Sequence, residues 1–583
     1  MLVYTTIGAC VASRGEIPGM ISQRVVESEN VPAASLDRFL DSPPDMESPL
    51  MPAATVAAIP EPAKRAERTA LRILQIAAMA IVTAVSIRKE FELDRFFIPK
   101  EIVMHAAAFA AGWLALARSR RLPSTRVDFF LLAALLLSAA SAVLATNPWL
   151  GARALAITVS SFVLFRTARA LGEAGLARPL LAALAFGAVL VAIGSLLQTY
   201  GVRTELFSLN RAPGGTLGNR NFVAHAAAFG FPIVLVVALG ARRVWGFLAG
   251  TLGAAILAGV LVLTRSRAAW LAFATVLVIL ILALLISRAL RGEARIWLRL
   301  GIIFVAAAGA VAAAVSVPNA LNWRSDDPYI DTVRRVAEFD EGSGRGRLIQ
   351  YRRSLAMAVA NPVLGVGPGN WGVEYPEFAA RRDPSMSSEG GMTWNPWPSS
   401  DWVAWTSERG FAPTLLLAIV FAAIALHAFR QLHAAPTAHE GLRATALLGV
   451  LAATGIAGAF DAVLLLALPS FFVWTALGAM WQPILPSIGT SHRGWWGTVM
   501  LVLILVSGAA TVRSALQLAA IEIHSTRDDR AALELAAKLD PGNYRLRLRL
   551  ARLGGDGKCR HAVAARDLYP QADAAGRLAR GCD

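Results

Sequence analysis

Charged residues and cysteines are both scarce in this sequence. Lys, Arg, Asp and Glu make up 16% of the 583 residues, whereas hydrophobic residues make up 56% and the mean hydropathy is +0.52. A composition this apolar excludes an ordinary soluble domain and indicates an integral membrane protein. The three cysteines cannot form a disulfide scaffold. Cys559 and Cys582 lie in one polar tail and would pair if that tail is outside the cytoplasm, which leaves Cys10 alone.

Acidic residues are fewer than basic ones, and the formal net charge is +16. The basic residues come mostly as short arginine groups between apolar runs rather than along one polar face. This pattern is typical of topology determinants that face anionic lipid headgroups. We therefore expect the lipid bilayer as a partner and no nucleic acid.

Apolar runs long enough to cross a ~30 Å hydrocarbon core recur about 13 times along the chain. The sequence therefore predicts an all-α integral membrane protein. The expected spans are residues 70–87, 101–117, 128–146, 150–170, 179–198, 221–240, 245–264, 268–287, 299–317, 407–429, 442–460, 462–482 and 496–513.

Three regions follow from this count. Residues 1–66 are rich in Pro, Ala, Ser and acidic residues, which predicts a disordered cytoplasmic tail before a polytopic membrane domain at 67–513. With the tail inside, the arginine-rich loops near residues 118–126, 242–243 and 288–299 are cytoplasmic, and the long loop at about 318–406 is outside. Residues 514–583 are outside as well. Their segment around Asp540-Pro541 resembles a tetratricopeptide junction, so we expect a short helical tail that packs on the membrane domain or binds an acceptor.

Arg265 and Arg267 break this charge pattern, because they lie in a short turn that the same count puts outside. Arginines that oppose the positive-inside bias at a membrane edge need an anionic partner. The obvious candidate is a lipid-linked phosphate or pyrophosphate.

A second unusual stretch lies in the long outside loop. Residues 346–360 have helical spacing and stop at Asn361-Pro362, and a turn with Gly365, Gly367 and Gly369 follows. Glycines beside basic residues are able to cradle a phosphate, but they also occur in simple tight turns. Both interpretations stay open on these residues alone.

Three segments together resemble the O-antigen ligase and O-antigen polymerase superfamily, which includes bacterial O-oligosaccharyltransferases. Residues 215–224 are similar to the family's Gly-Thr-Leu-Gly-Asn-Pro-Asn element, with Arg220 where proline is usual. Residues 264–270 are similar to its Thr-x-Ser-Arg-x-x-Trp element. Residues 346–371 resemble its periplasmic-loop signature, with these positions in register: Arg347, Pro362, Gly365, Gly367, Gly369 and Asn370.

The resemblance implies a GT-C-like glycosyltransferase in the bacterial inner membrane, with its N-terminus cytoplasmic and its C-terminus periplasmic. Such an enzyme moves a glycan from undecaprenyl pyrophosphate to an acceptor hydroxyl at the periplasmic face, and the acceptor is lipid A core, a growing polysaccharide or protein. No metal and no cofactor are expected. Donor binding is expected from Arg265, Arg267, Arg220, Arg347, Gly365, Gly367, Gly369 and Asn370.

The sequence departs from the family at the catalytic base. The family has a His eleven positions before a Gly; Gly410 fits that glycine, and Ser399 stands where the His is expected. None of the eight histidines lies between residues 226 and 426. Because Ser399 cannot act as a base without a partner, the candidates for acceptor activation are Asp401, Glu374 and Glu377 in the same loop.

Other interpretations stay open. Glu408 fits the family's acidic position or pairs with a neighbour, and His105 and His225 lie near the outer ends of their spans, where packing is the simpler role. Four tryptophans either stack on sugars or, as the simpler role, belong to an interfacial aromatic belt: Trp394, Trp397, Trp402 and Trp405. A transporter or flippase of lipid-linked glycans, or a noncatalytic membrane scaffold, would also account for much of the composition.

Overall fold

The computed structural model describes residues 63–88, 93–208, 211–323, 325–334, 342–481 and 493–582. The predicted tail at 1–66 lies outside these ranges except for its last four residues. The described residues form helices and connecting loops, which confirms the all-α membrane fold. Among them, eleven helices are long and apolar enough to cross a membrane. These are α2 (Asp94–Ser119), α3 (Arg126–Val143), α4 (Pro148–Glu173), α5 (Ala177–Thr199), α6 (Arg220–Leu239), α7 (Val244–Thr264), α8 (Arg267–Ile286), α10 (Ala294–Ser316), α15 (Phe411–His433), α16 (Ala438–Phe460) and α18 (Arg493–Thr526).

Two of the predicted spans form helices that do not meet both the length and the composition of the other eleven. Helix α1 (Arg65–Thr83) carries Glu67, Arg68 and Arg72 in its first half, so no stretch of 18 residues in it is free of several charges. Helix α17 (Ala467–Met480) has 14 residues, which is about 21 Å at 1.5 Å per residue and shorter than the ~30 Å core. The estimate of about 13 spans therefore counted these two helices as full crossings, whereas eleven helices of the described chain meet the length and composition.

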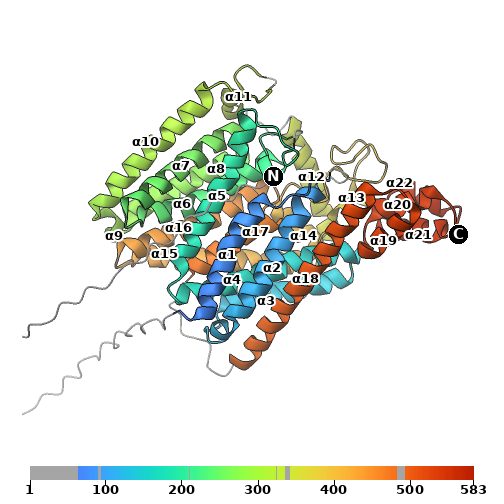
Figure 1. Cartoon of the computed structure of the whole chain (residues 1–583), viewed down its shortest axis with the longest axis horizontal. Helices are drawn as coiled ribbons and strands as arrows, with labels where there is room; N and C mark the ends of the chain where they lie inside the picture. The colour runs from blue at the N-terminus through green and yellow to red at the C-terminus, as the bar shows by residue number, and fades with distance from the viewer. Residues whose placement is uncertain are drawn as a thin grey trace, which may run out of the picture. The chain divides into compact units, whose positions relative to one another are not determined.

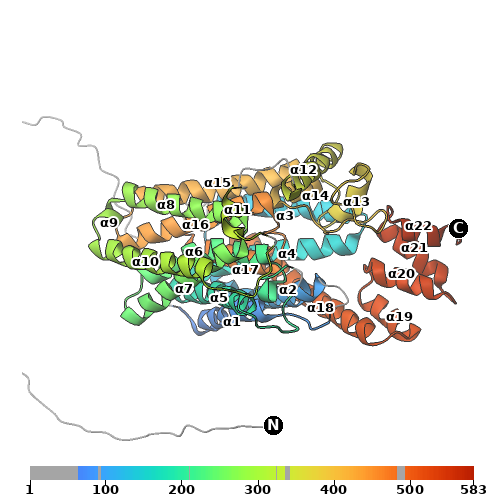
Figure 2. The same ribbon diagram turned by 90° about the horizontal axis from the view of Figure 1, so that it is seen from above.

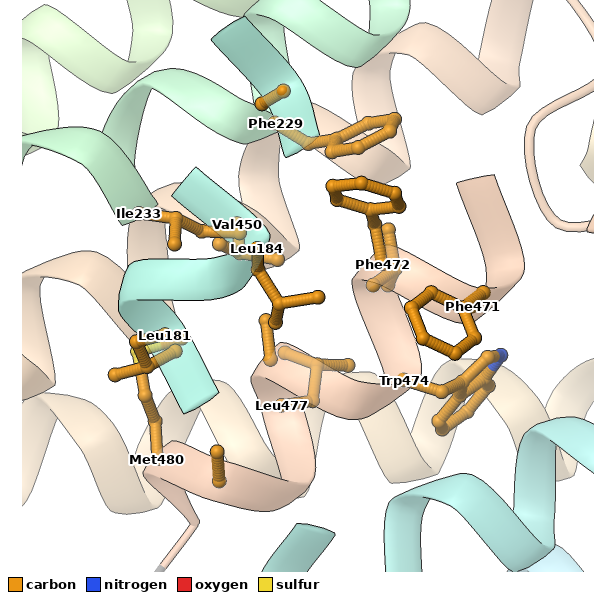
Figure 3. Close-up of a cluster of buried hydrophobic side chains, with 14 of the residues drawn as sticks. Leu181, Leu184, Phe229, Ile233, Val450, Phe471, Phe472, Trp474, Leu477 and Met480 are labelled. Atoms are coloured by element: carbon orange, nitrogen blue, oxygen red, sulfur yellow. The ribbon is translucent and has the colours of Figure 1, made fainter. Parts of the chain in front are cut away.

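Helix α6 lies at the centre of the membrane domain. In its most apolar stretch 94% of the residues are buried, against 17% for α10, which packs on α7 at the edge of the domain (Figure 1). Helices α5, α7, α8, α16 and α17 surround it. Figure 3 shows Phe229 of α6 facing Phe472 of α17, with their ring centres 6.4 Å apart. Helix α6 is therefore held by packing against five neighbouring helices.

A buried ion cluster joins α3 to α4. Asp128 of α3 is bound by Arg166 and Arg169 of α4, both at 3.0 Å, and all three side chains are fully buried. Asp128 also accepts a hydrogen bond from the backbone N–H of Thr125, which caps α3. Buried charges of this kind are tolerated because each is paired.

Short helices follow the membrane spans at one end of the domain. Helices α11 (Pro328–Arg334), α12 (Gly342–Ala360), α13 (Trp371–Phe378) and α14 (Asp401–Arg409) lie in the long predicted loop, and Gly410 separates α14 from the span α15. Helix α18 continues beyond the predicted end of its span and leads to α19 (Arg530–Leu539), α20 (Tyr544–Leu553), α21 (Lys558–Leu568) and α22 (Asp573–Ala579), as Figures 1 and 2 show. A disulfide between Cys559 and Cys582 joins the beginning of α21 to the residues after α22.

Candidate functional site

The segment that enters α6 is fixed by neighbouring helices. It forms a single 3-10 turn, η1 (Gly215–Leu217), whose first N–H donates to the side chain of Gln198 at 2.8 Å. The ammonium group of Lys100 donates to the carbonyl of Thr216 at 2.8 Å. Arg220, the first residue of α6, therefore projects from an anchored turn rather than from a free loop.

Two arginines from different helices meet on one tryptophan. The guanidinium of Arg220 lies 4.9 Å from the centre of the Trp323 ring, and that of Arg265 lies 4.7 Å from the same centre. Arg265 follows α7 with φ 52°, and its Nε donates to the hydroxyl of Thr332 at 2.8 Å. Arg220 also interacts electrostatically with Arg265 and Arg211. We call Arg211, Arg220 and Arg265 the arginine cluster.

The other two arginines predicted to bind the donor, Arg267 and Arg347, lie on α8 and α12. Arg267 is the first residue of α8, two positions after Arg265, and is half-buried. Arg347 of α12 interacts electrostatically with Tyr351 and with His225 of α6. The N-terminal end of α6 thus lies near arginines from other elements, and the helix's own N-terminus adds a positive dipole there.

A carboxylate that the sequence did not single out lies at the N-terminal end of α6. Asp461 follows α16, is half-buried, and accepts a hydrogen bond from the side chain of Asn221 at 3.2 Å. It interacts electrostatically with Tyr351, whose hydroxyl donates to the carbonyls of Ser399 and Ala459. Burial raises the pKa of Tyr351 to about 12. One signal did mark Asp461 in the sequence, since it is the single residue between the predicted spans 442–460 and 462–482.

The two histidines considered from the sequence occupy different surroundings. His105 is buried in α2, and its Nδ1 shares a 2.7 Å hydrogen bond with the hydroxyl of Ser160. His225 is buried in α6 and interacts with Asp461 and Arg347, but neither ring nitrogen has a hydrogen-bond partner among the described residues. His225 therefore belongs to the site and His105 to the packing of α2 on α4.

Asp401 is enclosed by backbone groups. Its carboxylate accepts hydrogen bonds from the N–H of Val463 at 3.0 Å and of Leu464 at 2.8 Å, and the side chain is 2% exposed. Burial raises the pKa of Asp401 to about 7, although the backbone hydrogen bonds oppose the shift. The neighbouring Ser400 caps α14 and donates to the carbonyl of Gly458. Asp401 and Ser400 thus fasten the beginning of α14 to the loop that carries Asp461.

The remaining predicted carboxylates lie on α13. Glu374 is half-buried and accepts a hydrogen bond from the hydroxyl of Thr146 at 2.5 Å. Glu377 is exposed. Among the described residues, neither carboxylate forms a hydrogen bond or ion pair with Asp461 or with the arginine cluster, so their predicted catalytic role stays a prediction.

The glycine turn packs on protein backbone. The N–H of Gly367 donates to the carbonyl of Glu408 at 2.8 Å, and the N–H of Gly365 donates to that of Asn361. A Cβ on Gly365 would lie 2.3 Å from the carbonyl carbon of Glu408. Asn370 exchanges hydrogen bonds with the backbone of Asn147. These contacts favour the tight-turn interpretation, and donor binding by this turn stays a prediction.

Glu408 is buried beside the same turn. Its carboxylate accepts from the N–H of Trp371 at 3.3 Å and from that of Gly369, while burial raises its pKa. Glu408 therefore joins α14 to the beginning of α13, which is the structural role left open by the sequence.

One stretch of the chain is similar to a known family. The family model described as O-Antigen ligase matches residues 252–419, which contain Arg265, Arg267, Arg347 and Ser399. The match supports membership in the O-antigen ligase family. That family suggests a glycosyltransferase or ligase activity, and the apolar helices indicate a multi-pass membrane protein. No curated protein matches the chain.

Proposed function

We propose that the chain transfers a glycan from undecaprenyl pyrophosphate to an acceptor hydroxyl at the periplasmic face of the bacterial inner membrane. The acceptor would be lipid A core, a growing polysaccharide or a protein. The arginine cluster is the donor site in this proposal, together with Arg267 and Arg347.

One observation carries the proposal: the guanidiniums of Arg220 and Arg265 lie 4.9 Å and 4.7 Å from the centre of one Trp323 ring, and the two arginines interact electrostatically. Two positive charges near one another repel, and the repulsion is strong where water is partly excluded. A pyrophosphate would offset it, because arginine binds phosphate oxygens through a planar fork of N–H groups. Lipid-linked pyrophosphate also reaches the membrane edge where these residues lie.

The transfer can be written with these residues in named roles. The acceptor oxygen forms a bond to the anomeric carbon of the glycan as the bond from that carbon to the pyrophosphate oxygen breaks. The leaving pyrophosphate takes the electron pair, and the arginines stabilise its growing charge. We assign the acceptor proton to the carboxylate of Asp461, which lies beside Arg347 and Tyr351 near the Ser399 position.

The predicted base Asp401 enters the proposal as a positioning residue. Its two oxygens bind the N–H groups of Val463 and Leu464, two and three residues after Asp461. It thereby fixes the loop from which Asp461 projects. Ser399 contributes its backbone carbonyl, which accepts the Tyr351 hydroxyl.

The test replaces Arg265 in the full-length protein and measures transfer of glycan from the lipid-linked donor. Removing a charged donor to a developing anion costs about 100-fold in rate, so Arg265→Ala should lose that much. Arg265→Lys should restore only part of the rate, because an ammonium group lacks the fork. Both variants keep a side chain at the positive φ of residue 265, so backbone strain is matched.

Arg203→Lys is the control, since Arg203 is an exposed arginine in the loop between α5 and α6. It should transfer glycan at the wild-type rate. Wild-type rates for properly folded Arg265→Ala and Arg220→Ala proteins would remove the arginine cluster from the reaction.

A further inference from the structure

A second site lies beside the proposed one. A cavity of about 450 Å³ lies between the membrane helices α2, α4 and α18 and the junction of α19 with α20. None of the arginine cluster lines it. The cavity is therefore distinct from the proposed pyrophosphate site, and its chemistry can be examined separately.

Aromatic rings form much of the cavity wall. Trp394 is 62% exposed and Trp149 is 40% exposed, and both line the cavity together with Trp397 and Phe97. Phe97 and Trp397 pack edge to face, with ring centres 5.4 Å apart. The face of an aromatic ring is electron-rich and attracts the weakly positive C–H groups of a sugar ring. Open tryptophan faces in a cavity are thus suited to a saccharide.

Buried polar groups without partners also line the cavity. Arg409 is 1% exposed, yet its Nε and Nη1 have no hydrogen-bond partner in the described part of the chain. The same is true of the hydroxyl of Tyr544, which is 3% exposed, and of Nε of Arg513. Buried polar atoms are almost always hydrogen-bonded, so a cluster of exceptions calls for a ligand or water. All three residues lie in the wall of one cavity.

The charges of the wall are balanced. Arg153 is bound by Glu101 at 2.7 Å and by Asp94 at 3.0 Å, which neutralises it. Counting the whole wall, four arginines face four carboxylates: Arg153, Arg409, Arg513 and Arg545 against Asp94, Glu101, Glu408 and Asp540. A balanced set of donors and acceptors suits hydroxyl groups, whereas an anion would need an excess of positive charge. The arginine cluster has that excess and this cavity does not.

The cavity is also near the proposed base. Leu464, Leu465 and Leu466 line it, and Leu464 is three residues after Asp461. Three residues span at most about 10 Å of extended chain. A ligand in the cavity is thus able to present a hydroxyl group toward Asp461.

We propose that this cavity binds neutral sugar residues of the acceptor, so that the junction of α19 with α20 forms part of the acceptor site. The aromatic faces hold the rings, and Arg409, Arg513 and Tyr544 bind their hydroxyl groups. The assignment to the acceptor, rather than to the donor's own glycan, rests on the proposed function. The binding of sugar in the cavity does not depend on the proposed function.

Tyr544→Phe is the most informative variant. It keeps the ring and removes a buried hydroxyl that has no protein partner, so the melting temperature should not fall. A hydrogen bond to a ligand contributes roughly 0.5–1.5 kcal/mol, which corresponds to about a threefold to tenfold change in Kd. Thr251→Val is the matched control, because Thr251 of α7 is also buried with an unpartnered hydroxyl but lies outside the cavity wall.

The probe is the neutral oligosaccharide fraction released by mild acid from the host's cell envelope. Binding to the full-length protein in detergent is followed by saturation-transfer NMR and titration. We expect Tyr544→Phe and Trp394→Ala to weaken binding about threefold to tenfold, while Thr251→Val and Arg265→Lys bind as the wild type does. Wild-type binding by both cavity variants, or no binding by the wild-type protein, would overturn the sugar site.

A transfer assay separates the two possible sources of sugar. Cavity variants should raise KM for the acceptor and leave KM for the lipid-linked donor unchanged. A raised donor KM with an unchanged acceptor KM would overturn the assignment to the acceptor. Sugar binding in a protein that transfers no glycan would contradict the proposed function and leave the sugar site standing.

Discussion

Ser399 stands where the O-antigen ligase family has its histidine, and its surroundings explain how a site could work without that base. The Tyr351 hydroxyl links the Ser399 carbonyl to the end of α16, where Asp461 follows. A carboxylate from another segment of the chain thus lies near the vacated position. The side chain of Asp401, though closer in sequence, binds the loop instead.

Asp461→Asn should reduce the rate of transfer and leave donor binding intact. General-base catalysis contributes about 10²–10⁴-fold, and the amide keeps the shape of the carboxylate while losing its basicity. The measurement is kcat at several pH values, together with the Kd for the lipid-linked donor. Asp326→Asn is the control, because Asp326 is an exposed acid of the long loop. An undiminished kcat in folded Asp461→Asn protein would return the search to Glu374, Glu377 and His225.

Because of Asp401, the protein should be more stable at mildly acidic pH than at pH 8. Its pKa is about 7 in the folded chain and about 3.9 when unfolded, so folding is penalised wherever the group is ionised. The penalty is present above pH 7 and disappears as the pH falls toward 4. The melting temperature should therefore rise from pH 8 to pH 5.5 by more in the wild type than in Asp401→Asn. Parallel pH profiles for the two proteins would show that the carboxylate is not buried as described.

At the scale of elements, the sequence predicted the helices well and the turns only in part. Apolar length identified every membrane helix, because burial in lipid requires long apolar runs. It could not show that α17 is short and enclosed, since a fully buried soluble-type helix is equally apolar. The pairing of Asp461 with Asn221 was out of reach as well, because it joins residues 240 positions apart.

The glycine turn before α13 resembles a family motif, but in the structure it packs on the backbone of α14. Gly365→Ala should destabilise the protein by roughly 1–3 kcal/mol, because residue 365 has φ 63° and its Cβ would meet the backbone of Glu408. Gly455→Ala in α16 is the control, since a Cβ there meets nothing within 4 Å. It should be neutral or stabilising by about 0.5–1 kcal/mol. Equal melting temperatures for the two variants would contradict the close approach of the turn to α14.

At the scale of the whole molecule, segments that the charge pattern assigns to the same side of the membrane contact one another. Asn221 meets Asp461, Arg265 meets Thr332, and Asn147 meets Asn370, all in or next to segments predicted to be outside. At the other ends of the spans, Arg118 meets Glu67 and Arg299 meets the carbonyl of Leu239, all in or next to segments predicted to be inside. The predicted alternation of the spans is therefore consistent with their three-dimensional arrangement.

The disulfide allows a test of which side of the membrane the C-terminal residues lie on. Disulfides persist in the bacterial periplasm and are rare in the cytoplasm, and Cys559 is bonded to Cys582 after the last span. In a Cys10→Ser background, a membrane-impermeant maleimide is applied to intact spheroplasts. It should label neither Cys559 nor Cys582 until a reductant is added, and both afterwards. Ala434→Cys, in the exposed loop after α15, should stay unlabelled throughout because that loop is predicted to be cytoplasmic. Labelling of Ala434→Cys from outside, or no labelling of Cys559 and Cys582 after reduction, would reverse the orientation and with it the periplasmic placement of the proposed site.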